Sequence, residues 1–347
     1  MTPALERRLL PALHLSQLSR VWRRLNRRKI VVAMYHGFTS VDAHDGIENH
    51  EGKHLHLRDF EAQLAFLKHH YQVIPLDAVV RALTLGTPLP DRAAVITVDD
   101  GYRSTYTVAF PALKRLHLPA SVYLATDFVE NRHFLWTDRV EYAVNHSRRD
   151  ALEFESGEKT LRLDLGDLDA RKAADRRLRS AIKALPQDSR DRAVDDVERA
   201  AGCAVTDVAG ELPLYDPLSW SDAHEMAESG LVTIGSHTHT HVILSRCEPS
   251  RVSEELTTSK RMLESRLGRP CTQFCYPNGR TGDFNAATRE QVKTHGFTSA
   301  LTTVYGMNDR QTDVFAFTRY NLGKPMRKGE VAVRLSGLMD LGSLLRR

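Results

Sequence analysis

Short apolar runs alternate with stretches of helical period along most of this chain, and this alternation constrains the fold more than any other feature. The clearest strand is 93–98, which is apolar and rich in β-branched residues. A predicted helix (110–116) follows it, and then a second apolar strand (120–125). An order of strand, helix and strand is typical of a parallel sheet with helical crossovers. At 347 residues the chain has the length of a (β/α) barrel with insertions.

This pattern stops after residue 130 and resumes near residue 216. The stretch between is polar, favours helix and is dense in Arg, Asp and Ala. We therefore predict an α/β barrel interrupted by an insertion. The expected parts are a basic amphipathic N-terminal helix (1–29), a first part of the barrel (30–130), a partly helical insertion (131–215), a second part of the barrel (216–325) and a C-terminal helix (326–347).

Charge and cysteine content limit the function classes. The net charge of +4 is small for this length and argues against a nucleic-acid partner. The four cysteines form no evident disulfide framework in a chain of this size. We expect no membrane-spanning helix, because no run of about 18 apolar residues occurs. The apolar stretch 9–18 is interrupted by polar residues and does not have the pattern of an export signal.

Positive charge is concentrated at the N-terminus, where Arg and Lys are frequent up to Lys29. Leucines and Trp22 fall among them at roughly helical spacing. Two interpretations remain open: a solvated helix packed on the domain, or a helix that lies on an anionic membrane surface. Because no export signal is evident, we expect a cytoplasmic protein, either soluble or peripheral on the inner face of the membrane.

Three histidines (His237, His239 and His241) follow the apolar run 231–234. Imidazole is the commonest side-chain metal ligand near neutral pH. In a strand all three would share one face, whereas in a helix only His237 and His241 would do so. Gly235 breaks the apolar pattern, so we favour a strand that ends and a helix that begins. A polar loop with three unrelated histidines is the alternative.

Two further predicted strands end in polar or turn residues. Asp99 and Asp100 follow the strand 93–98, and Asn278 lies in a turn after the strand 272–276. In a (β/α) barrel all the carboxyl ends of the strands open onto one face, where distant side chains meet. Two histidines and one carboxylate form a common open site for a catalytic divalent metal. The sequence therefore predicts a metal site in which one aspartate binds the metal and its neighbour acts as a base.

These residues resemble a known family. Thr97-Val98-Asp99-Asp100-Gly101 is similar to the first motif of the polysaccharide deacetylases of the NodB-homology type, carbohydrate esterase family 4, which usually has Phe at the second position. His237-Thr238-His239-Thr240-His241 matches the second motif, His-Ser/Thr-x-x-His. Phe274-Cys275-Tyr276-Pro277-Asn278-Gly279 loosely resembles the third, usually of an Arg-Pro-Pro-Tyr-Gly type.

The resemblance covers about 30–130 and 216–322. It implies a distorted (β/α) barrel that removes N-acetyl groups from amino sugars. It also implies that Thr238 fixes the site by a hydrogen bond and that His239 is not a metal ligand.

The resemblance assigns a role to each remaining motif residue. Asp99 would be the catalytic base. Asp100, His237 and His241 would hold the metal, which is usually zinc in this family, although another divalent transition metal is an alternative. The backbone N–H of Asn278 would help to bind the oxyanion.

Two departures from the family pattern concern the catalytic groups. Cys275 replaces the arginine of the third motif. The chain has no histidine beyond His295, so it has no counterpart of the late histidine that supplies the family's general acid. We predict that His36 is the acid, because it also follows a predicted strand (30–34); a structural histidine is the alternative. For Arg319 we expect an ordinary surface salt bridge; a pair with a buried carboxylate is the alternative.

The leading functional hypothesis is a metal-dependent hydrolase that removes N-acetyl groups from amino sugars of a polysaccharide or of its lipid-linked precursor. Its partner would be an N-acetylated oligo- or polysaccharide. The alternative is a non-catalytic carbohydrate-binding barrel that has lost the general acid. We expect the loops 38–57 and 131–215 to choose the substrate.

Overall fold

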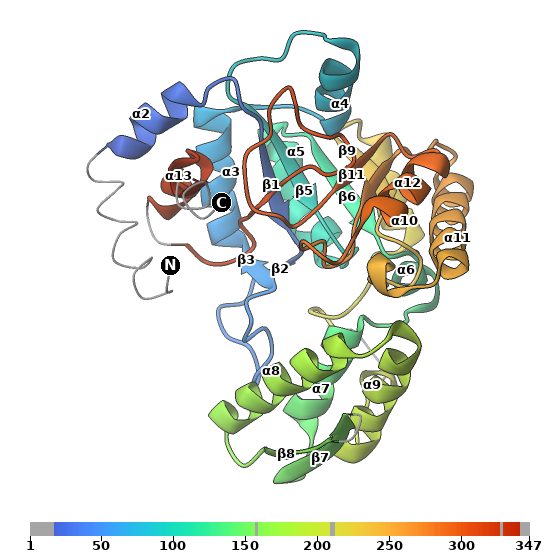
Figure 1. Cartoon of the computed structure of the whole chain (residues 1–347). Helices are drawn as coiled ribbons and strands as arrows, with labels where there is room; N and C mark the ends of the chain where they lie inside the picture. The colour runs from blue at the N-terminus through green and yellow to red at the C-terminus, as the bar shows by residue number, and fades with distance from the viewer. Residues whose placement is uncertain (1–16, 157–158, 209–211, 327–328, 341–347) are drawn as a thin grey trace.

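A curled parallel sheet forms the centre of the molecule (Figure 1). The computed structural model describes residues 17–156, 159–208, 212–326 and 329–340. The strands run in the order β11-β10-β9-β6-β5-β1-β12, and β4 pairs with β5. All of these pairings are parallel. The strands of this sheet are β1 (Val31–Tyr35), β4 (Gln72–Val73), β5 (Ala93–Val98), β6 (Ala120–Leu124), β9 (Val232–Ser236), β10 (Gln273–Cys275), β11 (Ser299–Leu301) and β12 (Tyr320–Asn321).

The central strands are covered on both faces. Every residue of β1, β5 and β6 is buried. Parallel strands of this kind are continuous apolar runs rather than alternating ones. This is the physical reason why these strands were predicted from the sequence within a residue or two of their bounds.

The stretch before β12 joins the two edges of the curled sheet. The N–H of Phe317 donates to the carbonyl of Ala300 in β11 at 3.0 Å, and the N–H of Thr302 donates to the carbonyl of Phe317 at 2.9 Å. A few residues later, Tyr320 pairs with Ala33 of β1. Because one segment contacts both edge strands, the sheet is a distorted (β/α) barrel, as predicted.

Helices surround this barrel, and local signals define their ends. Ser219 caps its helix: its hydroxyl accepts a hydrogen bond from the N–H of Asp222 at 3.1 Å. Gly268 ends another helix at a φ of 63°, where glycine is favoured. The helices around the barrel are α3 (Leu57–His70), α4 (Leu76–Leu85), a π-helix (Thr105–Ala109) that leads into α5 (Phe110–Leu116), α6 (Thr126–Asn131), α10 (Trp220–Glu228), α11 (Pro249–Leu267) and α12 (Ala286–Thr294).

The predicted insertion carries its own apolar core, at the bottom of Figure 1. Its elements are α7 (Trp136–His146), β7 (Ala151–Ser156), β8 (Lys159–Asp164), α8 (Leu168–Ala184) and α9 (Gln187–Ala201). The antiparallel pair β7 and β8 was not predicted. The loop before α3 contacts this unit: Ile47 belongs to its core, and His50 Nε2 lies 2.7 Å from a carboxylate oxygen of Asp175.

The two terminal helices are shorter than predicted. Helix α2 (Leu18–Leu25) lies within the predicted 1–29, and residues 1–16 lie outside the described part of the chain. Helix α13 (Glu330–Leu335) ends before Gly337, whose φ is 78°, so a continuous helix over 326–347 is wrong for residues 336–340. Residues 341–347 are not described. Among the described helices, none is long and apolar enough to cross a membrane.

Candidate active site

The carboxyl ends of β1, β5, β9 and β10 meet around a cavity of about 240 Å³. Each of the predicted catalytic and metal-binding residues lines this cavity. Residues from the loop before α3, from the insertion and from the segments after β11 and β12 complete the wall. The lining residues are His36, Glu51, Gly52, Lys53, Asp99, Asp100, Leu135, Trp136, Thr137, His237, His241, Asn278, Thr303, Asn321, Gly323 and Lys324.

Three of these side chains form a compact ligand set. The Oδ1 atom of Asp100 lies 3.4 Å from Nε2 of His237 and 3.4 Å from Nε2 of His241. The two imidazole rings lie edge to face, with centroids 4.9 Å apart. The structure therefore brings together Asp100, His237 and His241, although about 140 positions separate the aspartate from the histidines in the sequence.

The backbone that presents the two histidines is a loop. Strand β9 ends at Ser236, and residues 237–241 are irregular, so the helix predicted from Gly235 is wrong. Thr238 and His241 have φ values of 67° and 57°. Two residues in this left-handed region turn the chain back on itself, which places His237 and His241 side by side without a helix.

A buried carboxylate on α11, that of Glu255, holds this loop. Its Oε2 atom accepts hydrogen bonds from the N–H groups of His239 and Thr240, both at 2.8 Å, and its Oε1 atom accepts one from the Thr240 hydroxyl at 2.6 Å. Charge-assisted hydrogen bonds of this kind are about twice as strong as neutral ones. Glu255 was not predicted, although a Glu between Val252 and Leu256 on the buried face of a helix is a signal for such a role.

His239 and Thr238 belong to the same motif, and the structure agrees with the expectation for His239 but not with that for Thr238. The ring of His239 points to Thr126, whose hydroxyl lies 2.9 Å from Nδ1, and to Asp127 rather than to Asp100. The Thr238 hydroxyl is buried and has no hydrogen-bond partner among the described residues. The side-chain hydrogen bond expected from Thr238 is therefore not found among the residues that the structure describes.

The donor set fits a divalent cation. Nδ1 of His237 lies 2.8 Å from the carbonyl of Cys275, so this nitrogen carries a proton, and Nε2 is left to bind a cation placed between it and Asp100. Two imidazole nitrogens and a carboxylate oxygen thus converge; Asp100 and His237 are buried, and His241 is partly buried. A cation bound between them would satisfy all three, and two nitrogens with one carboxylate oxygen is a common set for catalytic zinc.

Asp99 forms a buried ion pair with Arg319. The guanidinium donates two hydrogen bonds to the carboxylate, from Nη1 at 2.8 Å and from Nη2 at 2.7 Å. Both side chains are almost fully buried, at 0% and 2% exposure. The surface salt bridge preferred for Arg319 is therefore wrong, and the alternative, a pair with a buried carboxylate, is correct. This arginine lies inside the barrel, next to Cys275, with Nη2 3.1 Å from the sulfur. The small Cys275 side chain leaves room for a guanidinium that comes from the segment before β12.

This ion pair sets the charge of the carboxylate. Burial raises the pKa of Asp99, but the charge and hydrogen bonds of Arg319 outweigh it, so that the pKa lies below its ordinary value. Asp99 is therefore ionised near neutral pH. Its Oδ1 atom accepts one hydrogen bond from Arg319 and keeps a second lone pair, so it can still accept a proton.

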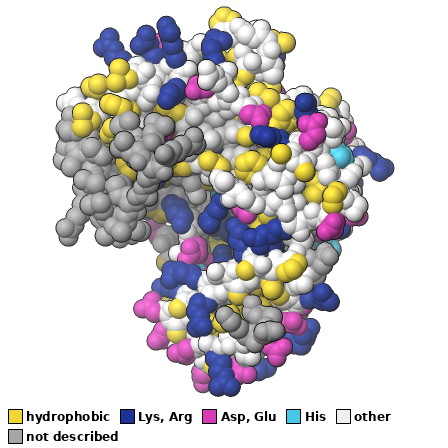
Figure 2. Space-filling view, viewed as in Figure 1, with side chains coloured by type: hydrophobic (Ala, Val, Ile, Leu, Met, Phe, Trp, Pro, Cys, Tyr) yellow, Lys and Arg dark blue, Asp and Glu magenta, His cyan; other side chains and the backbone are white. Residues whose placement is uncertain are grey.

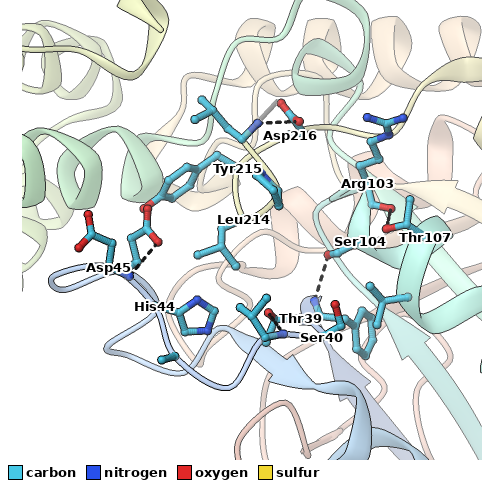
Figure 3. A pocket seen from close by; sticks show the side chains of 17 residues that line it. Thr39, Ser40, His44, Asp45, Arg103, Ser104, Thr107, Leu214, Tyr215 and Asp216 are labelled. Atoms are coloured by element: carbon cyan, nitrogen blue, oxygen red, sulfur yellow. Dashed lines mark hydrogen bonds between the residues drawn. The ribbon is translucent and has the colours of Figure 1, made fainter. Parts of the chain in front are cut away.

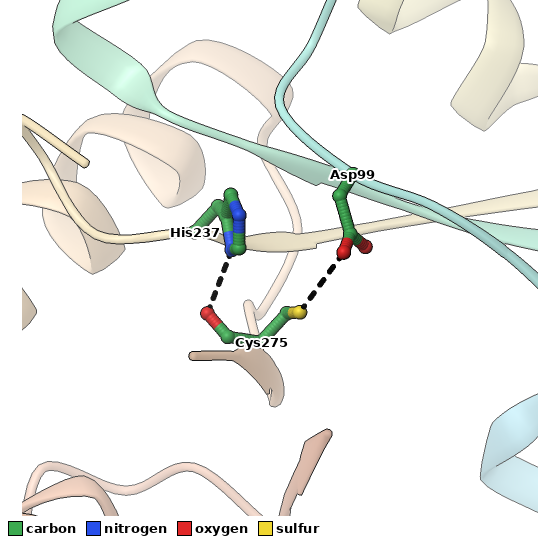
Figure 4. A group of neighbouring side chains, drawn as sticks. All are labelled: Asp99, His237 and Cys275. Atoms are coloured by element: carbon green, nitrogen blue, oxygen red, sulfur yellow. Dashed lines mark hydrogen bonds between the residues drawn. The ribbon is translucent and has the colours of Figure 1, made fainter. Parts of the chain in front are cut away.

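A second group of potential ligands, Asp99, His237 and Cys275, is shown in Figure 4. We do not interpret it as a metal site. The Asp99 carboxylate is neutralised by Arg319, and burial raises the pKa of the Cys275 thiol, which keeps it protonated. The dashed lines in Figure 4 show instead that the thiol contacts Asp99 at 3.5 Å and that His237 bonds to the Cys275 carbonyl.

His36 and Asn278 also reach the cavity. His36 directly follows β1, and burial lowers its pKa while the nearby Asp100 and Asp99 carboxylates raise it, with a net decrease. Asn278 follows β10 at a φ of 60°, and its carbonyl accepts a hydrogen bond from the Thr303 hydroxyl. Their positions agree with the predicted general acid and oxyanion donor, whereas the lowered pKa leaves His36 mainly neutral near pH 7 and so does not favour it as an acid. Both roles stay predictions.

The lysine and aromatic residues in the cavity wall were not predicted. The ammonium group of Lys53 bonds to Asp138, to the Tyr102 hydroxyl at 2.9 Å and to the Thr137 hydroxyl at 2.9 Å. This network joins the loop before α3 to the first helix of the insertion. Trp136, the first residue of that helix, lies beside it in the cavity wall.

A larger cavity of about 400 Å³ contains none of the predicted site residues (Figure 3). It lies between the loop around His44 and the segment 212–216, with Arg103, Ser104 and Thr107 on its far side. Its wall contains no cluster of carboxylates and histidines comparable to that around Asp100. We therefore place the chemistry in the smaller cavity.

Fold and site together define a (β/α)-barrel hydrolase, with its polar cluster at the carboxyl ends of the strands. The chain belongs to the polysaccharide deacetylase family, whose sequence profile matches residues 86–300. The hydrolases of this family act on N-acetyl amide bonds. The family, the barrel and the enzyme class predicted from the motifs are thus confirmed.

Individual relatives support the same family. The Bacillus subtilis protein YxkH is 19% identical over 301 residues, which cover 86% of this chain and 73% of that protein. The poly-beta-1,6-N-acetyl-D-glucosamine N-deacetylase of Escherichia coli K12 is 42% identical over 59 residues, only 17% of this chain and 9% of that enzyme. The structure of the Streptococcus pyogenes deacetylase PplD in complex with acetate superposes with a TM-score of 0.58 at 17% identity, over 88% of this chain and 98% of that one. At this identity the likeness shows the fold alone.

Proposed function

We propose that this protein is a metal-dependent deacetylase that removes N-acetyl groups from amino sugars of a polysaccharide or of its lipid-linked precursor. The convergence of Asp100, His237 and His241 at 3.4 Å, next to an ionised Asp99, is the observation that supports this proposal most directly. The family supports the chemistry, and the 42% identical segment of the Escherichia coli enzyme supports an N-acetylglucosamine polymer as the substrate class.

Asp100, His237 and His241 would hold the metal. When bound, a divalent cation lowers the pKa of water and polarises a carbonyl group. Zinc is our first candidate because the set contains two imidazoles and one carboxylate.

The residues of the chain would move the protons. Asp99, kept ionised by Arg319, accepts the proton of the attacking water as the new C–O bond forms. The N–H of Asn278 donates a hydrogen bond to the oxygen of the tetrahedral intermediate. His36 donates a proton to the amine nitrogen as the C–N bond breaks, which releases acetate and the free amino sugar.

The walls of the cavity would select the sugar. Lys53 and Trp136 come from the two segments, 38–57 and 131–215, that we expected to choose the substrate. A cavity of about 240 Å³ is below the range of sites that enclose a drug-sized ligand, about 300–1,000 Å³. It therefore suits a single acetamido sugar of a longer chain better than a whole oligosaccharide.

The test is acetate release from chitin oligosaccharides, measured together with the metal content of the purified protein. We expect His237→Ala to lose both metal and activity. His239→Ala, in the same loop but with its ring turned toward Thr126 and Asp127, should keep both. Bound metal without acetate release from any amino-sugar substrate would instead favour the carbohydrate-binding alternative.

The role of His36 has a test of its own. His36→Ala should lower turnover by about 100-fold or more while the metal stays bound, because a general acid typically contributes 10²–10⁴-fold. His44→Ala, in the neighbouring loop and outside the small cavity, is the control. Wild-type turnover in His36→Ala would exclude His36 as the acid.

A further inference from the structure

Arginines that the catalytic site does not use surround a hollow of about 300 Å³ at the N-terminal end of the chain. Arg20, Arg23 and Arg24 come from α2, Arg27 follows that helix, and Arg92 directly precedes β5. Asp91 is the single carboxylate in the wall, and it pairs with Arg27 at 3.1 Å. The wall therefore contains several more positive charges than negative ones.

The innermost arginine is Arg23. It is 9% exposed, and its Nη1 atom is buried without a hydrogen-bond partner among the described residues. A buried donor without a partner costs free energy, and for a charged group the cost is higher. Its guanidinium also lies over the ring of Phe66, with 5.6 Å to the centroid, so the side chain is held in place rather than free to reach solvent.

The positive charge of these arginines affects a neighbouring histidine, His70. Burial and then the positive charges of Arg23 and other arginines lower the pKa of His70 to about 4. This side chain therefore stays neutral and does not add to the charge of the hollow. The donors and the field at this place are suited to an anion with several oxygen atoms, such as a phosphate group.

An apolar stripe lies next to the arginines on the same helix. Leu18, Val21 and Leu25 are three and four residues apart, so they share one face of α2. They are 43%, 54% and 66% exposed, which makes them three of the few large exposed apolar side chains among the described residues. In the space-filling view, hydrophobic side chains and Lys or Arg side chains lie side by side at the upper left, over the region of α2 (Figure 2).

We propose that α2 and the arginine hollow dock this protein on a membrane surface that contains anionic phospholipids. The apolar stripe enters the interface between headgroups and acyl chains, and the hollow around Arg23 takes a lipid phosphate. Apolar residues that face outward beside arginines are the pattern of a helix that lies in such an interface. A neutral partner would leave the arginines unmatched, and a soluble anion would leave the apolar stripe exposed.

The position of this surface determines how the enzyme is oriented. Helix α2 leads into the amino end of β1, and Arg92 precedes the amino end of β5. His36 and Asp99 follow the carboxyl ends of the same two strands. A strand of five or six residues is about 16–20 Å long, so the small cavity lies about one strand length away from the docking surface, at the opposite end of the barrel. If the proposed deacetylase activity is correct, this orientation favours a polysaccharide chain over a sugar linked to a lipid at the membrane surface.

Co-sedimentation with lipid vesicles tests the docking. The full-length protein is mixed with vesicles of phosphatidylcholine alone, or with vesicles in which about a third of the lipid is phosphatidylglycerol. We expect binding only to the anionic vesicles and its loss at about 1 M salt, where the Debye length falls to about 3 Å. Vesicle binding does not depend on catalysis. It can therefore be absent in a protein that still releases acetate, and it can be present in a protein that does not.

Two sets of substitutions probe the two parts of the surface. Each arginine near an anionic surface contributes roughly a fivefold factor to binding, so R20Q/R24Q/R27Q should weaken it by about 100-fold. L18S/V21S/L25S should weaken it without a change in charge. The control R177Q/R192Q/R261Q removes the same charge from exposed positions elsewhere, and it should bind within about threefold of the wild type. Thermal unfolding shows that each variant is folded, and the two sets alter different side chains.

Three results would overturn the proposal. One is equal binding to both kinds of vesicle, or to neither. Another is equal weakening by R177Q/R192Q/R261Q, which would mean that only the net charge matters. The third is binding that does not belong to this surface and a lipid. If binding survives both α2 variants but is lost when residues 2–16 are deleted, a different segment contacts the vesicle. If inorganic phosphate displaces the vesicle at millimolar concentration, the hollow binds a free anion.

Discussion

Replacement of Arg319 by methionine tests how the barrel keeps its catalytic base ionised. In the wild type, two hydrogen bonds of 2.8 and 2.7 Å join the guanidinium to Asp99, and both side chains are buried. Methionine has a similar length but no charge, so Asp99 would remain in the same buried place without a partner. Removal of one member of a buried ion pair costs about 3–5 kcal/mol.

The carboxyl group can avoid most of this cost by taking up a proton. One pKa unit corresponds to 1.36 kcal/mol, so a cost of about 3–4 kcal/mol corresponds to an increase of roughly two to three units in the pKa of Asp99. Arg319→Met should therefore lose activity in mildly acidic solution, where Asp99 takes up a proton, and the acid limb of its pH profile should move upward by about two units. The assay is acetate release at saturating metal, measured as a function of pH.

The same reasoning gives a sign for stability. The folded-state pKa of Asp99 lies below its ordinary value, so the ion pair contributes stability above the unfolded-state pKa, and this contribution is lost as the pH falls through the folded-state pKa. The deficit of Arg319→Met should therefore be largest near neutral pH and smaller in acid. The double variant Arg319→Met/Asp99→Asn should recover stability but not activity. An unchanged acid limb, with a free energy of unfolding within about 0.5 kcal/mol of the wild type, would refute the reasoning.

Three further predictions follow from other contacts. Glu255→Gln keeps the size of the side chain but weakens its bonds to the loop at His239 and Thr240, so we expect metal affinity to fall by about 10–100-fold in a chelator competition; unchanged affinity would show that the loop holds its shape alone. A Cβ at Gly37 would lie 2.0 Å from Nδ1 of the buried His54, so Gly37→Ala should destabilise the fold by about 2 kcal/mol or more in denaturant unfolding, whereas a loss below about 0.5 kcal/mol would mean that His54 moves aside. Removal of the metal with a chelator should abolish acetate release, and added zinc should restore it; full activity in the chelator would exclude metal dependence.

The strands and the identity of the site residues were accessible from the sequence for a common reason. Strands such as β5 are buried on both faces, so they are continuous apolar runs, and polar residues directly after them mark the carboxyl ends where a barrel builds its site. The strand ends before Asp99 and His237 were therefore found, although the backbone after Gly235 is a loop and not the predicted helix. The two terminal helices were predicted too long, because few tertiary contacts fix where they begin and end.

The residues that were missed act through tertiary contacts. The sequence shows that Cys275 stands where the family motif has an arginine, and a buried carboxylate was the second choice of partner for Arg319. It does not show that this partner is Asp99. An arginine within the apolar stretch 315–322 was a usable signal, because Arg is rarely buried unless it is paired. The left-handed Thr238 had no such signal, because β-branched residues rarely adopt this conformation. Histidine adopts it more often, but this preference alone does not single out His241 among the histidines of the motif.

The central claim is that one cation is shared by Asp100, His237 and His241. Anomalous diffraction from crystals grown with zinc locates that ion directly. We predict a single peak within the cavity, about 2.0–2.2 Å from Nε2 of both histidines and from a carboxylate oxygen of Asp100. A peak at Asp99 and Cys275 instead, or no peak among these residues in crystals that contain zinc, would contradict the claim.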